Sequence, residues 1–459
     1  MTSPDGTNSL SRRDAEALFH PYTNAVANDR DGPLVITRGS GVRVYDEDGR
    51  EYIEGMSGLW CASLGFGETR LADAAASQMR TLPFYHGFSQ KSHPPQIELA
   101  ERLLALAPVP MKRVFFCNSG SEAADTAVKL VWYYNNARGL PRKKKIVSRF
   151  KAYHGVTVAA ASITGVPANH TAFDLPISGF LHTGMPHFYR FGRSGESEEA
   201  FATRCAAELE DLILAEGPDT VAAFFAEPVM GAGGVIVPPT SYFEKIQAVL
   251  DRYDVLMVAD EVICGFGRTG SFWGCETFGI RPDILTCAKA LTSGYLPISA
   301  LLIGEKVYDA VAPQTDAIGT FGHGFTYSGH PVPAAVAIET LKIYEEMDLV
   351  AHVRQRSKPF LERLHGFSAH PLVGETMGVG LVGAVELVAD RETRKPFEAA
   401  DKVGLRVAAK AQAHGLIVRA MGDRVAFSPP LIISEAEIGV MFDRFSAALD
   451  EIAQELGTA

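Results

Sequence analysis

The sequence predicts an α/β fold, in which a large domain with a mostly parallel β-sheet is joined to a smaller α+β domain. Two observations support this prediction. Short apolar runs alternate with helical patterns from about residue 113 to about residue 300, which is typical of a parallel sheet with helices on both faces. Beyond a helix expected from residue 334, strand patterns return among helices at 400–414 and 435–456. The length of 459 residues also favours two domains.

We expect three segments. Residues 1–70 form an N-terminal segment that joins the small domain, residues 71–340 form the large domain, and residues 341–459 form the C-terminal small domain. Residues 1–15 are small and polar, so we expect no regular structure in them. Residues 34–54 alternate polar and apolar side chains around an Asp-Gly turn, which indicates an antiparallel hairpin.

The elements of the large domain follow from periodicity. Amphipathic patterns predict helices over 70–80, 95–107, 201–216 and 241–253. Apolar runs predict strands over 113–117, 143–150, 220–229, 255–259 and 284–288, and a returning strand after residue 291. Residues 165–200 are rich in Gly, Pro, His and Phe and show no clear period, so we expect a long and partly helical excursion there.

Two of these strands end on residues that suit one cofactor. The run 255–259 is followed by Asp260 and Glu261, and the run 284–288 ends on Lys289. Sites in open α/β sheets gather at the carboxyl ends of strands. A lysine that forms an imine, and an acid against a pyridinium nitrogen, are the two groups that pyridoxal phosphate requires. We therefore expect Lys289 and Asp260 to be catalytic and give Glu261 no catalytic role. The alternative, a solvated surface lysine, fits poorly after an apolar run.

A second feature predicts an anion site. Ser119 and Glu122 have the spacing of a capping box at the start of a helix. The small residues Ser119, Gly120 and Ser121 allow backbone amides to approach a phosphate at that helix N-terminus. The alternative is an ordinary capped helix. Tyr153 can stack on a pyridine ring, and we assign no role to the neighbouring His154.

Five ordered motifs together resemble one family. They are NSGSEA at 118–123, AYHG at 152–155, AEP at 226–228, the stretch 254–295 and GFTYSGHP at 324–331. Over about residues 20–430 the chain resembles the class III (omega-) aminotransferases, which are fold type I pyridoxal-phosphate enzymes, and among them the amine:pyruvate omega-transaminases in particular. The resemblance implies a pyridoxal 5'-phosphate cofactor, no metal, and a homodimer with shared active sites, with a tetramer as the alternative.

The resemblance also implies the residues of the site. The cofactor would contact Ser119, Gly120, Ser121, Tyr153, Glu227, Asp260, Val262 and Lys289, with Phe325 and Thr326 reaching the phosphate of the neighbouring subunit. The substrate would contact Tyr22, Leu59, Trp60, Phe88, Tyr153 and Arg419. For Trp60 and Phe88 the alternative is simple packing. For Arg419, whose fork would hold a carboxylate and swing aside for apolar amines, the alternative is a surface arginine.

Three functions share these motifs. The first is transfer of an amino group from an amine or an omega-amino acid to pyruvate. The others are a transaminase that prefers 2-oxoglutarate and a semialdehyde aminomutase. A regulator with a DNA-binding domain is disfavoured, because the resemblance starts near residue 20 and the chain is acidic.

Composition limits the remaining classes. The net charge of −11 argues against nucleic acid and anionic membranes as partners. Six scattered cysteines without a CxxC pair indicate reduced thiols in a cytoplasmic protein. No secretory signal and no apolar run of membrane-spanning length is visible. The glycine-rich CGFGRTG loop follows the acid pair and does not open a helix, so we reject a dinucleotide site.

Overall fold

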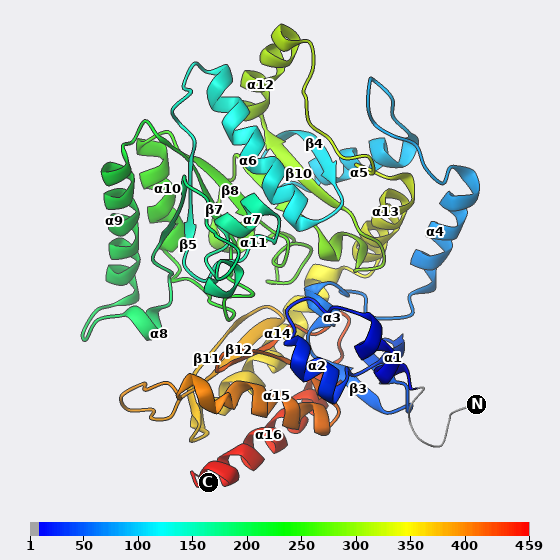
Figure 1. Ribbon diagram of the computed structural model, residues 1–459, viewed down its shortest axis with the longest axis vertical. Helices are drawn as coiled ribbons and strands as arrows, with labels where there is room; N and C mark the ends of the chain where they lie inside the picture. The colour runs from blue at the N-terminus through cyan, green and yellow to red at the C-terminus, as the bar shows by residue number, and fades with distance from the viewer. Residues whose placement is uncertain (1–8, 459) are drawn as a thin grey trace.

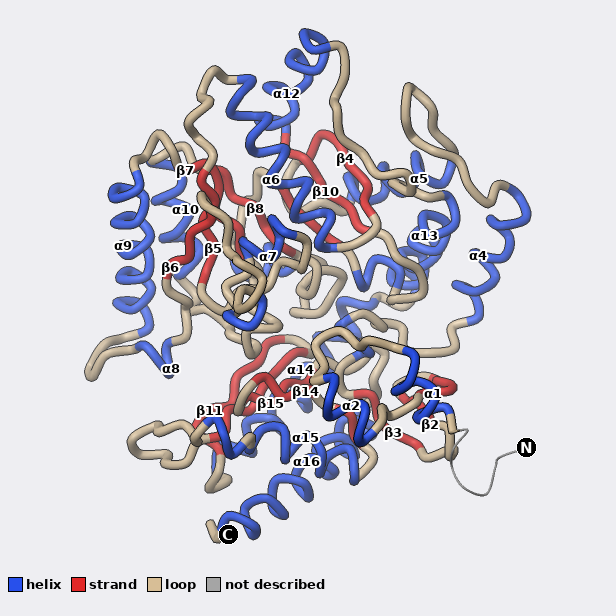
Figure 2. The backbone as a smooth tube through the Cα atoms, viewed as in Figure 1, coloured by secondary structure: helices blue, strands red, loops and turns tan. Residues whose placement is uncertain are grey.

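The computed structural model describes residues 9–458, which fold into two lobes (Figure 1). The upper lobe surrounds one large sheet. The lower lobe holds two small sheets together with both ends of the described chain, and Figure 2 shows these sheets apart from the large one. None of the described helices is long and apolar enough to cross a membrane.

The large sheet has seven strands and is mostly parallel, as predicted. Only β10 runs against its two neighbours, so the other strands share one direction. The carboxyl ends of these parallel strands therefore lie along one edge of the sheet. In spatial order the strands are β4 (Met111–Cys117), β10 (Ser299–Gly304), β9 (Ile284–Cys287), β8 (Leu256–Asp260), β7 (Val221–Ala226), β5 (Lys145–Arg149) and β6 (Phe180–Thr183).

Helices cover both faces of this sheet because its strands are apolar on both sides. In β7, Phe224 packs into one buried cluster and the next residue, Phe225, into the other. The cluster around Phe225 includes α6 (Gly120–Ala137), α7 (Val158–Ile163) and α12 (Glu305–Ile318). The cluster around Phe224 includes α5 (Pro94–Ala105), α9 (Glu198–Glu216), α10 (Tyr242–Arg252) and α13 (Pro331–Glu346).

The first small sheet joins distant parts of the chain. Its strands are β1 (Ile36–Ser40), β2 (Arg43–Asp46), β3 (Glu51–Glu54) and β13 (Leu416–Ile417), and β13 pairs parallel with β3. The expected hairpin is thus part of a three-stranded meander, with the Asp-Gly turn between β2 and β3. Residues 10–17 form α1 (Leu10–Ala17), contrary to the expectation of no regular structure, because Ser9 caps the helix. Residues 1–8 lie outside the described part.

The second small sheet is antiparallel. Its strands in order are β11 (Val373–Val379), β12 (Val382–Leu387), β15 (Arg424–Phe427) and β14 (Arg419–Met421), and three helices pack with it: α14 (Leu349–Gly366), α15 (Val403–Ala413) and α16 (Glu435–Leu456). The remaining helices are α2 (Ala25–Asp31), α3 (Ser57–Trp60), α4 (Thr69–Thr81), α8 (Phe188–Phe191) and α11 (Gly274–Phe278), with short 3-10 turns η1 to η4.

A buried ionic network connects the two lobes. His187, which precedes α8, lies 2.8 Å from a carboxylate oxygen of Glu375 on β11. Arg424 on β15 donates to the same oxygen at 2.9 Å, pairs with Glu386 on β12, and donates to the Gly234 carbonyl of the large lobe at 2.6 Å. His187, Glu375 and Glu386 have the spacing of metal ligands, but the Arg424 guanidinium already bonds both carboxylates.

Candidate active site

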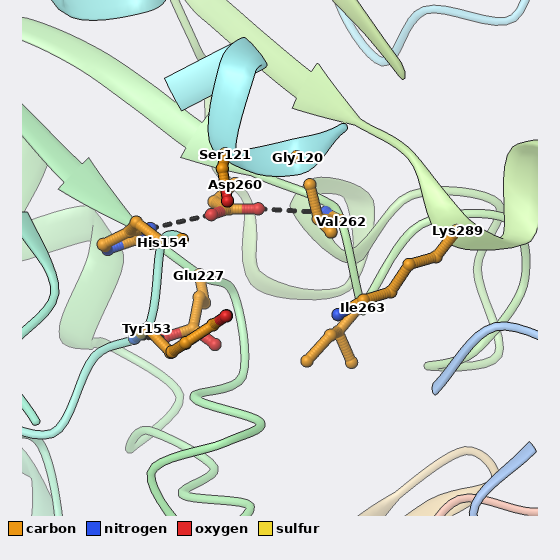
Figure 3. Close-up of a pocket in the computed structure, with 10 residues that line it drawn as sticks. Gly120, Ser121, Tyr153, His154, Glu227, Asp260, Val262, Ile263 and Lys289 are labelled. Carbon is orange, nitrogen blue, oxygen red and sulfur yellow. Dashed lines mark hydrogen bonds and ion pairs between the residues drawn. The ribbon is translucent and has the colours of Figure 1, made fainter. Parts of the chain in front are cut away.

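The candidate site lies at the sheet edge where the carboxyl ends of five strands meet. One pocket there collects the residues that follow β4, β5, β7, β8 and β9 (Figure 3). The residues that line it are Gly120, Ser121, Tyr153, His154, Gly155, Glu227, Asp260, Val262, Ile263 and Lys289. The structure therefore brings Asp260 and Lys289 together, as their strand-end positions predict.

The Asp260 carboxylate is held from two sides. His154 Nδ1 lies 2.7 Å from Oδ2, and the backbone N–H of Val262 donates to Oδ1 at 3.0 Å, both drawn as dashed lines in Figure 3. Asp260 and His154 are both buried, and His154 Nε2 has no hydrogen-bond partner among the described residues. From the sequence alone we assign His154 no role. Its place beside Tyr153, just beyond β5, is the signal that could have found it.

Lys289 sits in an unusual backbone conformation. It begins the turn η2 (Lys289–Thr292) with φ of +51°, and its carbonyl accepts the N–H of Gly294 at 3.1 Å. Such a left-handed residue other than glycine is uncommon and clusters at functional sites. Burial lowers the pKa of Lys289, and the charge of Arg419 lowers it further, while Asp260 acts in the opposite direction. A neutral amine is the form that acts as nucleophile or base.

Glu227 braces the loop that carries Tyr153. Its carboxylate accepts the N–H of Tyr153 at 3.1 Å and the N–H of Gly231 at 2.9 Å. Burial raises the pKa of Glu227, with the negative charge of Asp260 adding to that effect. Burial likewise raises the pKa of the Tyr153 hydroxyl. Glu227 thus holds the backbone of Tyr153, whose ring we expect to stack on the cofactor.

The N-terminus of α6 is open to an anion, although the capping box is incomplete. Ser119 accepts the N–H of Glu122 at 3.2 Å, but the Glu122 carboxylate accepts the N–H of Asn118 at 2.8 Å instead of that of Ser119. The loop after β5 comes very close here. A Cβ on Gly155, whose φ is +135°, would lie 2.5 Å from Ser121 Oγ. The close approach leaves backbone amides and a positive helix end in the pocket.

Glu261 does not line the pocket. Its carboxylate accepts the backbone N–H groups of Gly274, at 2.9 Å, and of Cys275 at the start of α11. Burial raises the pKa of Glu261 to about 7. The residue therefore ties the glycine-rich loop 262–273 to α11.

Four of the expected substrate residues are Trp60, Leu59, Tyr22 and Arg419, and their surroundings differ. Trp60 is buried in a cluster that also contains Ile263 of the pocket, whereas Leu59 is 57% exposed. Tyr22 and Arg419 both lie close enough to Tyr153 to shift the pKa of its hydroxyl in opposite directions. None of these four residues lines the pocket itself, and Leu59 lines a separate hollow with Ser57, Cys61 and Tyr295.

Phe88, Phe325 and Thr326 do not reach this pocket within one chain. Phe88 lines a separate cavity with residues 319–324, and a Cβ on Gly324 would lie 3.1 Å from its ring. Phe325 packs against the cluster beneath α6. A contact of Phe88 with the substrate is therefore not made within one chain, and the expected role of Phe88 stays a prediction.

The residues present fit pyridoxal phosphate. A fixed carboxylate, a lysine of lowered pKa and a helix N-terminus are the partners for its ring nitrogen, its aldehyde carbon and its phosphate. Because His154 Nε2 has no hydrogen-bond partner among the described residues, the imidazole can carry its proton on Nδ1, the nitrogen that faces Asp260.

Comparisons with known proteins agree with this fit. The family model described as Aminotransferase class-III matches residues 25–449. "Gamma aminobutyrate transaminase 3, chloroplastic" of Solanum lycopersicum is 51% identical over 435 residues, which is 95% of this chain and 84% of that protein. A thermostable omega transaminase mutant from Pseudomonas jessenii superposes with a TM-score of 0.97 at 58% identity, covering 98% of this chain and 100% of that one. The omega transaminase of Pseudomonas jessenii in complex with PMP matches with the same TM-score and coverage at 57% identity.

Proposed function

Because the chain belongs to the class III aminotransferases, which use pyridoxal 5'-phosphate, we propose that it transfers an amino group from an amine or an omega-amino acid to pyruvate, giving alanine and an aldehyde or ketone. The observation that carries the proposal is the meeting of Lys289 and Asp260 in one pocket, with Arg419 close enough for its charge to act on Lys289. The bound cofactor supplies the electron sink for the reaction.

We assign the following roles to the residues of this chain. Lys289 holds the cofactor and then, as a free amine, moves a proton to and from the substrate carbon. Asp260, oriented by His154 and Val262, keeps the ring nitrogen protonated. Ser119, Gly120 and Ser121 bind the phosphate at the α6 N-terminus. Glu227 keeps the Tyr153 loop in place.

Arg419 is the proposed carboxylate site. It begins β14, and its charge acts on both Lys289 and Tyr153. Its planar fork suits the carboxylate of pyruvate or of an omega-amino acid. The other proposed walls, Leu59, Trp60 and Tyr22, are large and mostly apolar, which favours an apolar substituent on the amine.

The relatives favour two donor classes. The gamma-aminobutyrate transaminase names support an omega-amino acid as donor, and the omega-transaminase structures support an amine without a carboxylate. The test is to incubate the holoenzyme with gamma-aminobutyrate or 1-phenylethylamine and either pyruvate or 2-oxoglutarate, and to measure alanine or glutamate. We expect alanine with both donors. Glutamate in excess of alanine would overturn the choice of pyruvate, and isomerisation of a semialdehyde without amine exchange would favour the aminomutase.

Arg419→Ala separates the two partners of the reaction. We expect KM for pyruvate to rise at least about tenfold, because a charged hydrogen-bond partner of its carboxylate is lost. We expect KM for 1-phenylethylamine to change less than about twofold, because that amine has no carboxylate. Arg391→Ala, an exposed arginine of the same lobe, is the control. An equal rise for both substrates would contradict the carboxylate role.

We also propose a homodimer in which each chain completes the site of its partner, and a cytoplasmic location. The dimer is supported by the family resemblance and by Phe88 and residues 319–324, which line one cavity that does not contain Lys289. The location is supported only by the six cysteines, all of which are free thiols. Relatives named as chloroplastic or mitochondrial provide the competing assignment.

A further inference from the structure

Residues 18–24 connect α1 and α2 and lie over the site with little burial of their own. Phe19 is 88% exposed and Tyr22 is 65% exposed. Tyr22 also adopts a left-handed backbone conformation, with φ of +52°. Most of the hydrogen bonds of this segment stay within it or reach α1 and α2, such as that between His20 and Asp14 at 2.6 Å. Apolar packing therefore does not fix where the segment lies.

The polar contacts of this segment with the large lobe run through the Tyr22 hydroxyl. Asn169 Nδ2 donates to that hydroxyl at 2.6 Å. The same hydroxyl lies beside that of Tyr153 and, after burial, is the main cause of the raised Tyr153 pKa. Tyr22 thus joins a residue of the pocket to a residue outside it.

Asn169 is a firm anchor. It ends the 3-10 turn η1 (Pro167–Asn169) and is buried. Gly165, just before this turn, is bonded to the loop that carries Tyr153. Its carbonyl accepts the N–H of Lys151 and its N–H donates to the carbonyl of Ala152, both at 2.8 Å. Asn169 and Tyr153 consequently belong to one rigid unit, against which Tyr22 is docked.

We propose that Asn169 is a positioning residue, which holds Tyr22 and the 18–24 segment against Tyr153 and thereby sets how tightly the amine substrate is bound. The proposal rests on the proposed function, because the amine occupies the space beside Tyr153. It gives the 165–200 excursion, for which the sequence predicts no role, a place in substrate selection.

The chemistry of Asn169 supports a specific role for its amide. Asn169 Oδ1 is buried without a hydrogen-bond partner among the described residues. An unpaired buried acceptor is destabilising, so a leucine of similar size would serve the packing at least as well. The amide is therefore explained by its bond to Tyr22 and not by the stability of η1.

The first test measures the position of the segment without using catalysis. Trypsin can cleave after Arg13 and Arg30, on either side of residues 18–24. In the holoenzyme we expect Asn169→Leu and Tyr22→Phe each to speed this cleavage about fivefold. We expect the double variant to be cleaved no faster than either single variant, because all three variants remove the same hydrogen bond. Thr171→Ala is the matched control, since its hydroxyl bonds only the Pro167 carbonyl of the same turn.

The second test measures substrate binding. We expect Asn169→Leu to raise KM for 1-phenylethylamine about fivefold with a much smaller change in kcat, and to leave the melting temperature at the value of the Thr171→Ala control. Wild-type cleavage rates in both variants, additive effects in the double variant, or an unchanged KM for the amine would each overturn the proposal. Cleavage is read independently of activity, so failure of the amine:pyruvate assay alone contradicts the proposed function and not the Asn169 contact.

Discussion

Lys289 differs from an ordinary lysine in three ways that act on the same atom. Its φ is positive, the residue is withdrawn from solvent, and two carboxyls lie at the ends of the next two strands, Asp260 as the last residue of β8 and Glu227 just after β7. The first property fixes the direction of the side chain, while burial lowers the pKa and the carboxyls limit how far it falls. A lysine held in this way can form and release a covalent bond at neutral pH.

Lys289→Ala is expected to abolish transamination, because no other described lysine lines the pocket. Activity should fall by at least about four orders of magnitude, as for other residues that form the covalent link. Borohydride reduction followed by peptide mapping should find the cofactor on Lys289 in the wild type. Lys306→Ala, on the exposed start of α12, is the control. A reduced adduct on another lysine would end the assignment.

Glu54 offers a test of pH dependence at the end of β3. Its Oε1 accepts the N–H of Met56 at 3.1 Å, its Oε2 has no partner among the described residues, and burial raises its pKa from 4.5 to about 8. The unfolded chain releases this proton near pH 4.5, whereas the folded chain keeps it until about pH 8. The free energy of unfolding therefore falls between these two values as the pH rises.

Glu54→Gln removes this loss, because the amide keeps an acceptor for Met56 and cannot ionise. We expect the variant to match the wild type at pH 4.5 and to exceed its unfolding free energy by a few kcal/mol at pH 8. Denaturant titrations at both pH values measure this difference. Glu51→Gln, on the same strand but half-exposed, is the control. A constant difference between wild type and Glu54→Gln across the range would contradict the account.

At the scale of elements, Arg424 holds three strands of the lower lobe to the large lobe. From its place on β15, Arg424 donates to the carboxylates of Glu375 on β11 and Glu386 on β12. It also donates to the Gly234 carbonyl of the large lobe. Arg424→Met would remove the guanidinium that both carboxylates share and leave His187 beside Glu375 and Arg190 beside Glu386. Breaking a buried pair at one partner costs at most about 3–5 kcal/mol. We expect a clear fall in melting temperature, measured against Arg391→Met. A fall equal to that of the control would show that the network contributes no stability.

The elements predicted from the sequence are those with a strong local signal. Apolar runs predict β7, β8 and β9. The rule that functional residues gather at the carboxyl ends of parallel strands predicts that Asp260 and Lys289 meet. The strand β6 was missed because its four residues, FLHT, are half polar, and pairing with β5 is what extends them. The contacts of Asn169 with Tyr22 and of Arg424 with Gly234 could not be predicted, because they join residues 147 and 190 positions apart.

At the scale of the whole molecule, the proposed dimer predicts a dependence on concentration. Phe88 and Tyr327 are exposed in one chain, at 45% and 59%, beside the 319–326 loop. We expect mass measurements in solution to give a dimer of the 49.5 kDa chain, and Thr326→Arg to weaken both assembly and cofactor retention. Lys306→Arg is the control on the exposed surface of α12. A fully active monomer at high dilution would contradict shared sites.

The pairing of β3 with β13 has a consequence for how the chain is made. β3 is complete once residue 54 has left the ribosome, but its parallel partner β13 is among the last strands to be synthesised. The first lobe to begin is therefore the last to close, and the edge of β3 stays unpaired while the whole large lobe is translated and folds. A nascent chain stalled before residue 416 is expected to expose that edge to chaperones, and release of the last segment closes it.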